Sequence, residues 1–383
     1  MAKSITLRTL LGYQNSAYNP HYFDDLINML KNKPEQFKKR ILKGSYWKKE
    51  VKEMKFDAVV GNPPYQENIG ATGNDSLSRQ LFPDFIKSSI SLNSHFVSLI
   101  TPARWFTADA QDKSFVKLSE FIMDNNHIKT MFHFKEEKDV FKDVEIKGRV
   151  CYFLYDNTFE GDVDFAVIAN GQKDIQTRSL FEDNLDVIIS DVMGLRILNK
   201  VRSNEFNSIT EITTGRNPFG IIGKDSVVSK ISKNAYYAGA CELRCKGDII
   251  RYIDGKEISK NREIFEKYKV FISKSAGNPN SDFKVIGTPY IGNPNSACTD
   301  SLFTVGCFDT KEEAQSLQKY MMTKFLRYMI SIVKASQNVT QIVYQFVPMQ
   351  DFTKPWPDEE LYKKYRLTKE EIAFIESMIK PME

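Results

Sequence analysis

The sequence lacks a long apolar stretch. No apolar run reaches the roughly 18 residues that a membrane-spanning helix needs, and the first six residues lack the apolar core of a signal peptide. These absences predict a globular protein of the cytoplasm that makes no membrane contact. A chain of 383 residues, of which 42% are hydrophobic, is long enough for two or three domains with a sizeable core.

Cysteine and histidine are also scarce. The five cysteines are an odd number without the paired spacing of a zinc site, and only four histidines could supplement them. We therefore expect neither a metal centre nor a disulfide framework. Cys241 and Cys245 are the one pair that keeps the metal alternative open.

Neither sign of charge dominates the whole chain, because the net charge is only +4 and the pI is about 8.5. Between Lys31 and Lys55, however, ten Lys and Arg residues stand against three Glu residues. Such a strip can follow a phosphate backbone through charge attraction and counterion release. It can equally be the solvated face of a helix, and both interpretations stay open.

An alternation of strands and helices begins after this basic segment. The apolar run 56–60 is closed by Gly-Asn-Pro-Pro, which is the pattern of a buried strand ended by a sharp turn. Further strands are predicted at 96–100, 128–134 and 150–155, and helices with one apolar face at 81–90 and 115–123. The alternation predicts an α/β unit with a mainly parallel sheet, which is half of a doubly wound, Rossmann-like domain.

The alternation is lost after about residue 205. Residues 212–300 are rich in turn signals, including Gly-Asn-Pro-Asn-Ser at 277–281 and again at 292–296, and carry fourteen Lys and Arg against nine Asp and Glu. A capping box opens a long helix from Thr310 to about Ser336, and another opens a last helix at Thr368. The predicted parts are a basic helical segment at 1–54, an α/β half-domain at 55–205, an irregular α+β domain at 206–350 and a helical tail at 351–383.

The most specific feature is the tetrapeptide Asn62-Pro63-Pro64-Tyr65, at the carboxyl end of the first predicted strand. Open α/β sheets bind their ligands at this end. The side-chain carbonyl of Asn62 and the backbone carbonyl of Pro63, held by two proline rings, can both accept hydrogen bonds from one amine. Tyr65 offers a ring face on which an extruded base can stack. The alternative is a purely rigid turn, but the preceding strand and the alternation that follows favour a site.

Residues 56–66, Phe-Asp-Ala-Val-Val-Gly-Asn-Pro-Pro-Tyr-Gln, resemble the catalytic motif of adenine-specific DNA methyltransferases from bacterial restriction–modification systems. Residues 99–106 resemble the strand and turn that follow in that family, residues 141–155 resemble the motif that helps to wall the flipped-base pocket, and 346–383 look typical of a subgroup. The resemblance implies methyl transfer from S-adenosylmethionine to a flipped adenine in double-stranded DNA. It also implies catalytic roles for Asn62, Pro63, Pro64 and Tyr65, a base pocket at Tyr65 and Phe141, and DNA recognition by the later domain.

The sequence departs from this family in one respect. Family members bind the cofactor with a Gly-rich turn upstream of Asn-Pro-Pro-Tyr, whereas only Gly12, Gly44 and Gly61 precede Asn62 here, and no Gly-x-Gly occurs anywhere. The cofactor-binding half is therefore expected to be missing. The chain is then a subunit of a split enzyme, a truncated product of a longer gene, or a recognition subunit that has lost transfer. A split enzyme needs a second methyltransferase or restriction subunit, which would dock on the exposed sheet edge.

Two other functions compete with methyl transfer. One is a non-catalytic, sequence-specific DNA-binding or specificity subunit that keeps the pocket as a relic. The other is a metal-dependent nuclease, because Asp124 and Glu145-Ile146-Lys147 have the acidic residues and lysine of such a site. Candidate DNA contacts have donors suited to phosphates or base edges, and they are Arg216, Asn217, Arg244, Lys246, Arg251, Lys324, Arg327, Gln337, Asn338 and Gln341.

Overall fold

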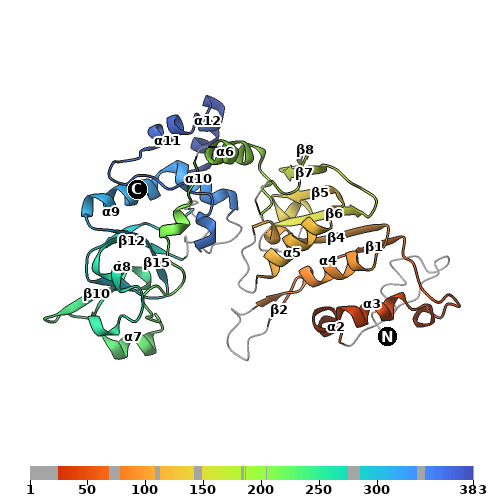
Figure 1. Cartoon of the computed structure of the whole chain (residues 1–383), viewed down its shortest axis with the longest axis horizontal. Helices are drawn as coiled ribbons and strands as arrows, with labels where there is room; N and C mark the ends of the chain where they lie inside the picture. Colours follow the sequence, from red (N-terminus) through yellow and green to blue (C-terminus); the bar gives the residue numbers. More distant parts are fainter. Residues whose placement is uncertain are drawn as a thin grey trace. The chain divides into compact units, whose positions relative to one another are not determined.

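The computed structural model describes residues 25–68, 78–107, 113–141, 149–182, 185, 187–203, 205–274, 285–333 and 341–382. The chain divides into two compact units, Met1–Asp186 and Val187–Glu383 (Figure 1). Within the described ranges, no helix combines the length and apolarity that crossing a bilayer requires.

A six-stranded sheet forms the centre of the first unit. Its strands are β1 (Ala58–Gly61), β4 (Phe96–Pro102), β6 (Val150–Asp156), β5 (Ile128–Phe134), β7 (Val163–Ala169) and β8 (Gln172–Arg178), in that spatial order. The pairs β1/β4 and β5/β7 are parallel, whereas β6 runs antiparallel to both of its neighbours. The α/β class is thus confirmed. As predicted, most strands are parallel, since β1, β4, β5 and β7 run in one direction, whereas β6 and β8 run against them. The hairpin β7–β8 adds a third antiparallel pair, and Asn170 and Gly171 have the positive φ angles of a tight hairpin turn.

The helices of the first unit have the apolar faces that their spacing predicts. They include α2 (Leu26–Asn32), α3 (Pro34–Leu42), the 3-10 helix η1 (Gly44–Trp47), α4 (Phe82–Ser91) and α5 (Ser114–Asp124), and the 3-10 helices η2 (Ala103–Thr107) and η3 (Glu137–Asp139) also lie in this unit. The α4 side chains Phe82, Ile86 and Ile90 are buried, and Phe82 packs on Phe115 of α5 with ring centroids 5.7 Å apart. Short helices before residue 50 are likewise present, and most of the cationic side chains between Lys31 and Lys55 are exposed.

The strand β1 differs from the prediction in its burial. A buried strand was expected for the apolar run 56–60, but β1 lies at the edge of the sheet and pairs only with β4 among the described strands. Ala58, Val60 and Gly61 are exposed, and Val60 keeps 75% of its surface accessible. The apolar run is therefore a strand, but Ala58 and Val60 stay exposed, whereas Val59 is half-buried.

Two smaller sheets form part of the second unit. One has four strands in the order β14 (Ser296–Cys298), β10 (Ala240–Arg244), β11 (Ile250–Asp254) and β9 (Ser232–Lys233). The other has three, in the order β13 (Tyr290–Gly292), β12 (Tyr268–Ser273) and β15 (Leu302–Phe308). Short helices lie among them, including η4 (Ile209–Ile212), α7 (Asp225–Ile231), η5 (Lys246–Asp248), η6 (Gly255–Glu257) and α8 (Arg262–Glu266). Phe219, Leu243, Ile253, Phe265 and Phe271 belong to one buried apolar cluster, so the turn-rich segment has a core of its own.

The remaining helices are α6 (Val192–Arg202), α9 (Lys311–Met322), α10 (Lys324–Val333), η7 (Gln341–Tyr344), α11 (Asp358–Lys364) and α12 (Lys369–Met378). The predicted single helix from Thr310 is broken at Thr323, which has an extended backbone. The carboxylate of Asp358, the first residue of α11, accepts hydrogen bonds from the amides of Lys324 and Phe325 and so starts a new helix. The capping box of the last helix is present as predicted, with Thr368 at its N-cap.

The border between the two units also differs from the predicted boundary near residue 205. Helix α6 packs against α10 and α12. Its Gly194 lies against Tyr328 of α10, and its Lys200 forms a 2.7 Å ion pair with the buried carboxylate of Glu371. The helix therefore belongs to the second unit.

Candidate active site

The Asn-Pro-Pro-Tyr motif occupies the carboxyl end of the edge strand β1. Asn62 and Pro64 are exposed, Pro63 is buried and Tyr65 is half-buried. The next residues form the hairpin of β2 (Gln66–Asn68) and β3 (Ser78–Gln80), and the backbone amide of Leu81 donates to the carbonyl of Tyr65 at 2.9 Å. The tetrapeptide is thus anchored by β1 on one side and by the hairpin on the other.

The hydroxyl of Tyr65 is buried and has no hydrogen-bond partner among the described residues. Burial raises the pKa of this phenol, and the nearby thiol of Cys151 acts in the same direction. The buried hydroxyl oxygen has almost no accessible surface to offer a ligand. The ring is therefore the part of Tyr65 that is available to a ligand.

Behind the motif, three buried polar side chains form a row across neighbouring strands. Thr101 of β4 and His133 of β5 are both registered with Cys151 of β6. The Thr101 hydroxyl lies 3.4 Å from the Cys151 sulfur. Burial raises the pKa of Cys151 to about 11 and lowers that of His133 to about 3, so both groups are uncharged at neutral pH. Sequence reasoning did not find this row, because its three members come from separate strands.

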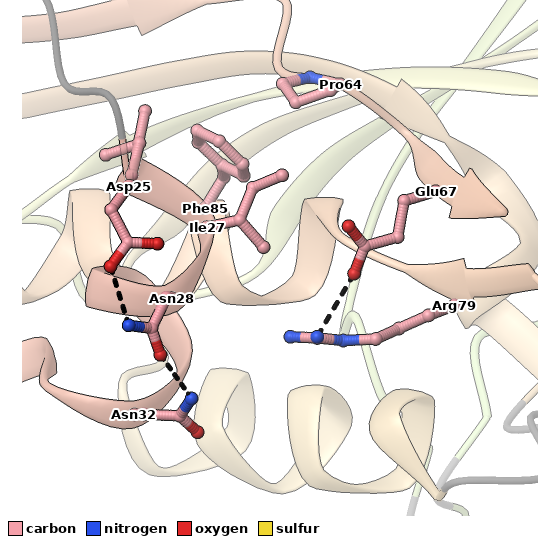
Figure 2. Close-up of a pocket in the computed structure, with 9 residues that line it drawn as sticks. Asp25, Ile27, Asn28, Asn32, Pro64, Glu67, Arg79 and Phe85 are labelled. Carbon is pink, nitrogen blue, oxygen red and sulfur yellow. Dashed lines mark hydrogen bonds and ion pairs between the residues drawn. The ribbon is translucent and has the colours of Figure 1, made fainter. Parts of the chain in front are cut away.

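A cavity of about 600 Å³ opens beside the motif (Figure 2). Its walls come from the start of α2, from Pro64, from the β2–β3 hairpin and from Phe85 of α4. On the hairpin wall, Arg79 donates to Glu67 at 3.1 Å and also lies 3.8 Å from Asp84. On the α2 wall, the amide of Asn28 donates to the carboxylate of Asp25 at 2.7 Å.

This cavity does not fit S-adenosylmethionine as a whole. The amino-acid end of the cofactor bears a carboxylate, which needs an uncompensated cation or several free donors. Arg79 is the cation among the lining residues, and Glu67 and Asp84 already compensate it. Asp25 could pair with the ammonium group of the cofactor, but it offers nothing to the carboxylate. The described residues around Pro64 therefore do not form a complete cofactor site.

Several predicted DNA contacts prove to hold the fold together. Arg327 is 1% exposed and donates to the carbonyls of Met322 and Thr323. Arg251 donates to the hydroxyl and the carbonyl of Ser232, which ties β11 to β9. The prediction that Arg327 faces DNA is wrong, because its side chain is buried and its Nε donates to backbone carbonyls of the same unit. Arg251 is likewise engaged in the fold.

Two further candidates are engaged in similar ways. The side-chain amide of Gln341 donates to the carbonyls of Thr210 and Thr213. Lys324 is paired with Glu376. Both therefore use their donors within the second unit.

Other candidates keep a surface position. Arg216 and Lys246 are exposed, and Asn217 has a left-handed backbone with φ of 54°. Arg244 is half-buried, with its guanidinium 4.4 Å above the ring of Tyr290. Roles of these four residues in DNA binding stay predictions.

Some predicted site residues cannot be placed. Gln337, Asn338 and the Glu145-Ile146-Lys147 segment lie outside the described residues. Phe141 is described and half-buried, and its part in a base pocket stays a prediction. All five cysteines are free thiols in the structure.

Comparison with known proteins supports the interpretation of the motif. The profile of the Eco57I restriction-modification methylase family matches residues 1–141. A protein of Mycoplasma pneumoniae described as an uncharacterized adenine-specific methylase is 32% identical over 149 residues, which are 39% of this chain and 33% of that protein. The match therefore spans about a third of the length of this relative.

Solved structures with a similar arrangement come from restriction enzymes. The type IIL restriction-modification enzyme MmeI in complex with DNA is 9% identical, with a TM-score of 0.41, over 75% of this chain and 46% of that one. The type IIG restriction endonuclease BpuSI is 13% identical, with a TM-score of 0.31, over 82% of this chain and 49% of that one. These scores are too low to carry an argument.

The family match begins before the basic segment and includes the Asn-Pro-Pro-Tyr motif, the α4 helix and the β4 and β5 strands. The resemblance seen in the sequence is thereby confirmed, and residues 1–141 of this chain match the Eco57I restriction-modification methylase family.

Proposed function

We propose that this chain is the adenine-binding and DNA-reading part of a restriction–modification DNA methyltransferase that acts on the N6 amine of a flipped adenine. We further propose that it needs a partner to bind S-adenosylmethionine. The observation that carries the proposal is the placement of Asn62-Pro63-Pro64-Tyr65 at the carboxyl end of β1, with Asn62 exposed and a cavity beside Pro64.

The chemistry explains why these residues suit an exocyclic amine. The nitrogen lone pair of adenine is delocalised into the ring, so the amine is a poor nucleophile. The side-chain carbonyl of Asn62 and the backbone carbonyl of Pro63 would accept the two amine hydrogens and draw the lone pair out of conjugation. Removing one such preorganised group costs about 100- to 1,000-fold in rate in comparable sites.

Tyr65 would hold the flipped base by stacking. Its hydroxyl is buried without a partner, whereas its ring is only half-buried. Stacking on an aromatic ring is worth about 1–3 kcal/mol per base. This energy offsets part of the cost of unstacking the adenine from the duplex.

The exposed edge of β1 is the evidence for the proposed partner. An edge strand presents unpaired backbone donors and acceptors that a strand from another chain can bind. Val60 is apolar and 75% exposed, and a partner strand would bury this side chain. No Gly-x-Gly turn occurs in the sequence. In this proposal a strand of the partner extends the sheet at β1 and brings the cofactor next to Asn62.

The proposed activity is tested with the chain and the partner that co-purifies with it. Transfer of labelled methyl groups from S-adenosylmethionine to adenine in DNA is measured for the wild type, Asn62→Ala and the control Gln66→Ala, which alters an exposed neighbour of the motif. We expect Asn62→Ala to lower transfer at least about 100-fold and to leave DNA binding intact. Equal loss of transfer in both variants would show that the motif is only structural. DNA binding without any transfer in the wild-type complex would favour a specificity subunit with a relic pocket.

The partner surface is tested separately with two variants, each of which replaces one exposed apolar side chain by lysine. Val60→Lys lies on β1, and the control Ile175→Lys lies on β8, the opposite edge of the same sheet, where Ile175 is 52% exposed. Both should leave the stability of the isolated chain nearly unchanged, because the side chains are already in solvent. Only Val60→Lys should weaken the complex. Methylation by the isolated chain would refute the need for a partner and leave the proposed activity standing.

A further inference from the structure

The basic segment, residues 31–55, is a folded part of the first unit. It comprises the end of α2, the whole of α3 and η1, and the loop that leads to β1. Both helices pack against α4, and Figure 1 shows them beside it. The amide of Gly44 donates to the carbonyl of Lys52 at 3.4 Å, and a Cβ at Gly44 would overlap the carbonyl of Val51, so the loop packs closely on the end of α3. The lysines of the segment therefore project from an ordered surface.

The exposed side of α3 is cationic. A helix turns by about 100° per residue, so Lys39, Arg40 and Lys43 fall within about 100° of its circumference, away from the buried Ile41. All three are exposed, and the guanidinium of Arg40 lies 5.1 Å from the centre of the Tyr46 ring. The returning loop adds exposed lysines at positions 48, 49, 52 and 55. Since that loop packs on the end of α3, the two groups of cations adjoin.

The charge of the basic segment is not compensated by carboxylates. Ten Lys and Arg residues against three Glu residues leave an excess of seven positive charges. None of the nine lysines forms an ion pair with a carboxylate in the described parts of the chain. Arg79 of the same unit differs, because Glu67 and Asp84 compensate it. Like charges at this density repel one another, and a bound polyanion would remove that repulsion.

The chemistry of this surface favours a phosphate backbone over other partners. Protein interfaces bury aromatic and apolar side chains and are depleted in lysine, whereas Val51 is the single large hydrophobic side chain exposed in this described segment. A helix that lies on a membrane needs an exposed apolar face, but α3 buries Ile41 and half-buries Phe37. A second copy of this chain would bring the same cations together and be repelled.

The basic segment starts at the rim of the candidate site. Asn32 lines the cavity beside Pro64 (Figure 2), and its neighbours Lys31 and Lys33 are exposed. A target base is flipped out by rotation about its own backbone, so the phosphates that flank it stay close to the motif that receives it. The first lysines of the segment are therefore near the place where these phosphates would lie.

We propose that the basic segment holds the phosphate backbone of duplex DNA beside the flipped nucleotide, without reading the base sequence. This inference rests on the proposed function, because its ligand is the duplex that carries the target adenine. Lysine ammonium groups are point charges that contact phosphates whatever the neighbouring bases are. The segment therefore supplies affinity that salt weakens, and the choice of sequence is left to contacts with base edges elsewhere.

The test is equilibrium binding of the full chain, with its co-purified partner, to two DNA duplexes of equal length and different base sequence. Fluorescence anisotropy measures the affinity over a range of sodium chloride concentrations. The double variant Lys39→Gln, Lys43→Gln should reduce the slope of log affinity against log salt by about 1.8, because two phosphate contacts are lost. Its loss of affinity should therefore be about 12-fold larger at about 50 mM than at about 200 mM salt, and equal for both duplexes.

A matched control removes two lysine charges from another helix. The double variant Lys311→Gln, Lys319→Gln changes two exposed residues of α9 in the second unit. It makes the same change in net charge and should bind both duplexes like the wild type, with the same salt slope. All four lysines are exposed, so circular dichroism should show unchanged folding for both double variants.

The outcomes separate the two proposals. If the wild type binds DNA and the α3 variant has the same affinity and salt slope, the segment is only a solvated surface and this inference alone fails. If the α3 variant keeps its DNA affinity but loses the co-purified partner in sedimentation, the segment binds a protein and the inference is overturned. A loss confined to one of the two duplexes would contradict a contact that ignores sequence. If the wild-type complex binds neither duplex, the proposed DNA-reading role fails as well.

Discussion

Replacing Lys269 by methionine should remove a pH-dependent contribution to the stability of the second unit. Lys269 lies on β12 with no exposed surface. Its ammonium group donates to the carbonyls of Phe265, Lys267 and Asn293 at 2.8, 3.0 and 2.8 Å. The third bond fixes the second Gly-Asn-Pro-Asn-Ser turn, whose Gly292 must lack a Cβ because the ring of Phe271 would lie 2.6 Å from it.

Burial lowers the pKa of Lys269 to about 7, against the smaller opposing effects of Cys298, Cys307, Glu242 and Cys241. The unfolded chain keeps the ordinary lysine pKa near about 10.4, so between these two values the unfolded chain binds a proton that the folded chain does not. The free energy of unfolding then rises by about 1.4 kcal/mol per pH unit in this window. Between about pH 6 and about pH 9 the gain is about 3 kcal/mol, and below about pH 7 the contribution is flat.

Urea unfolding followed by tryptophan fluorescence measures this effect, since Trp356 reports on the second unit, whereas Trp47 and Trp105 report on the first. The difference in unfolding free energy between the wild type and Lys269→Met should grow by about 3 kcal/mol over that pH range. The control Lys319→Met removes an exposed charge from the same unit and should show no such growth. A difference that stays constant with pH would mean that the three carbonyls keep the ammonium charged, and the reasoning would be wrong.

Three further results are expected. Tyr65→Phe should keep methyl transfer, because the lost hydroxyl has no partner, whereas Tyr65→Ala should lower kcat/KM by about 10- to 100-fold as stacking is lost. Lys200→Met should destabilise the chain by about 2 kcal/mol in urea unfolding, because the buried carboxylate of Glu371 loses its ion pair and Lys200 is partly exposed. Burial raises the pKa of Glu371, but its interactions with Lys200 and its hydrogen bonds with Thr368 together outweigh this and hold the pKa below its ordinary value. The effect should therefore vanish as the pH falls through that lowered pKa. Cys151 and Cys298, whose burial raises their thiol pKa values, should resist a thiol reagent in the folded chain while the other three thiols react, and rapid labelling of all five would contradict the burial.

Local patterns in the sequence were sufficient for most elements of the first unit. The strands β4, β5 and β6 and the helices α4 and α5 lie where apolar spacing predicts them. The capping box at Thr368 is also present, because a helix start depends on hydrogen bonds within four residues. The Asn-Pro-Pro-Tyr motif was found for the same reason, since its residues are contiguous.

Contacts between distant segments decided what the sequence could not. The apolar spacing of β6 is the same for either strand direction, so its antiparallel insertion between β4 and β5 is a property of the assembled sheet. The helix break at Thr323 depends on Asp358, which lies in the separate helix α11. Arg327 follows a helical pattern that permits a surface position, yet packing encloses it.

The sequence by itself determined the chemistry of the candidate site, because Asn62, Pro63 and Tyr65 are adjacent and their functional groups are intrinsic to them. Only the tertiary structure decided that this site ends an exposed edge strand, and that Thr101, His133 and Cys151 lie behind it. Burial and strand order depend on which segments pack together, and no local pattern records that.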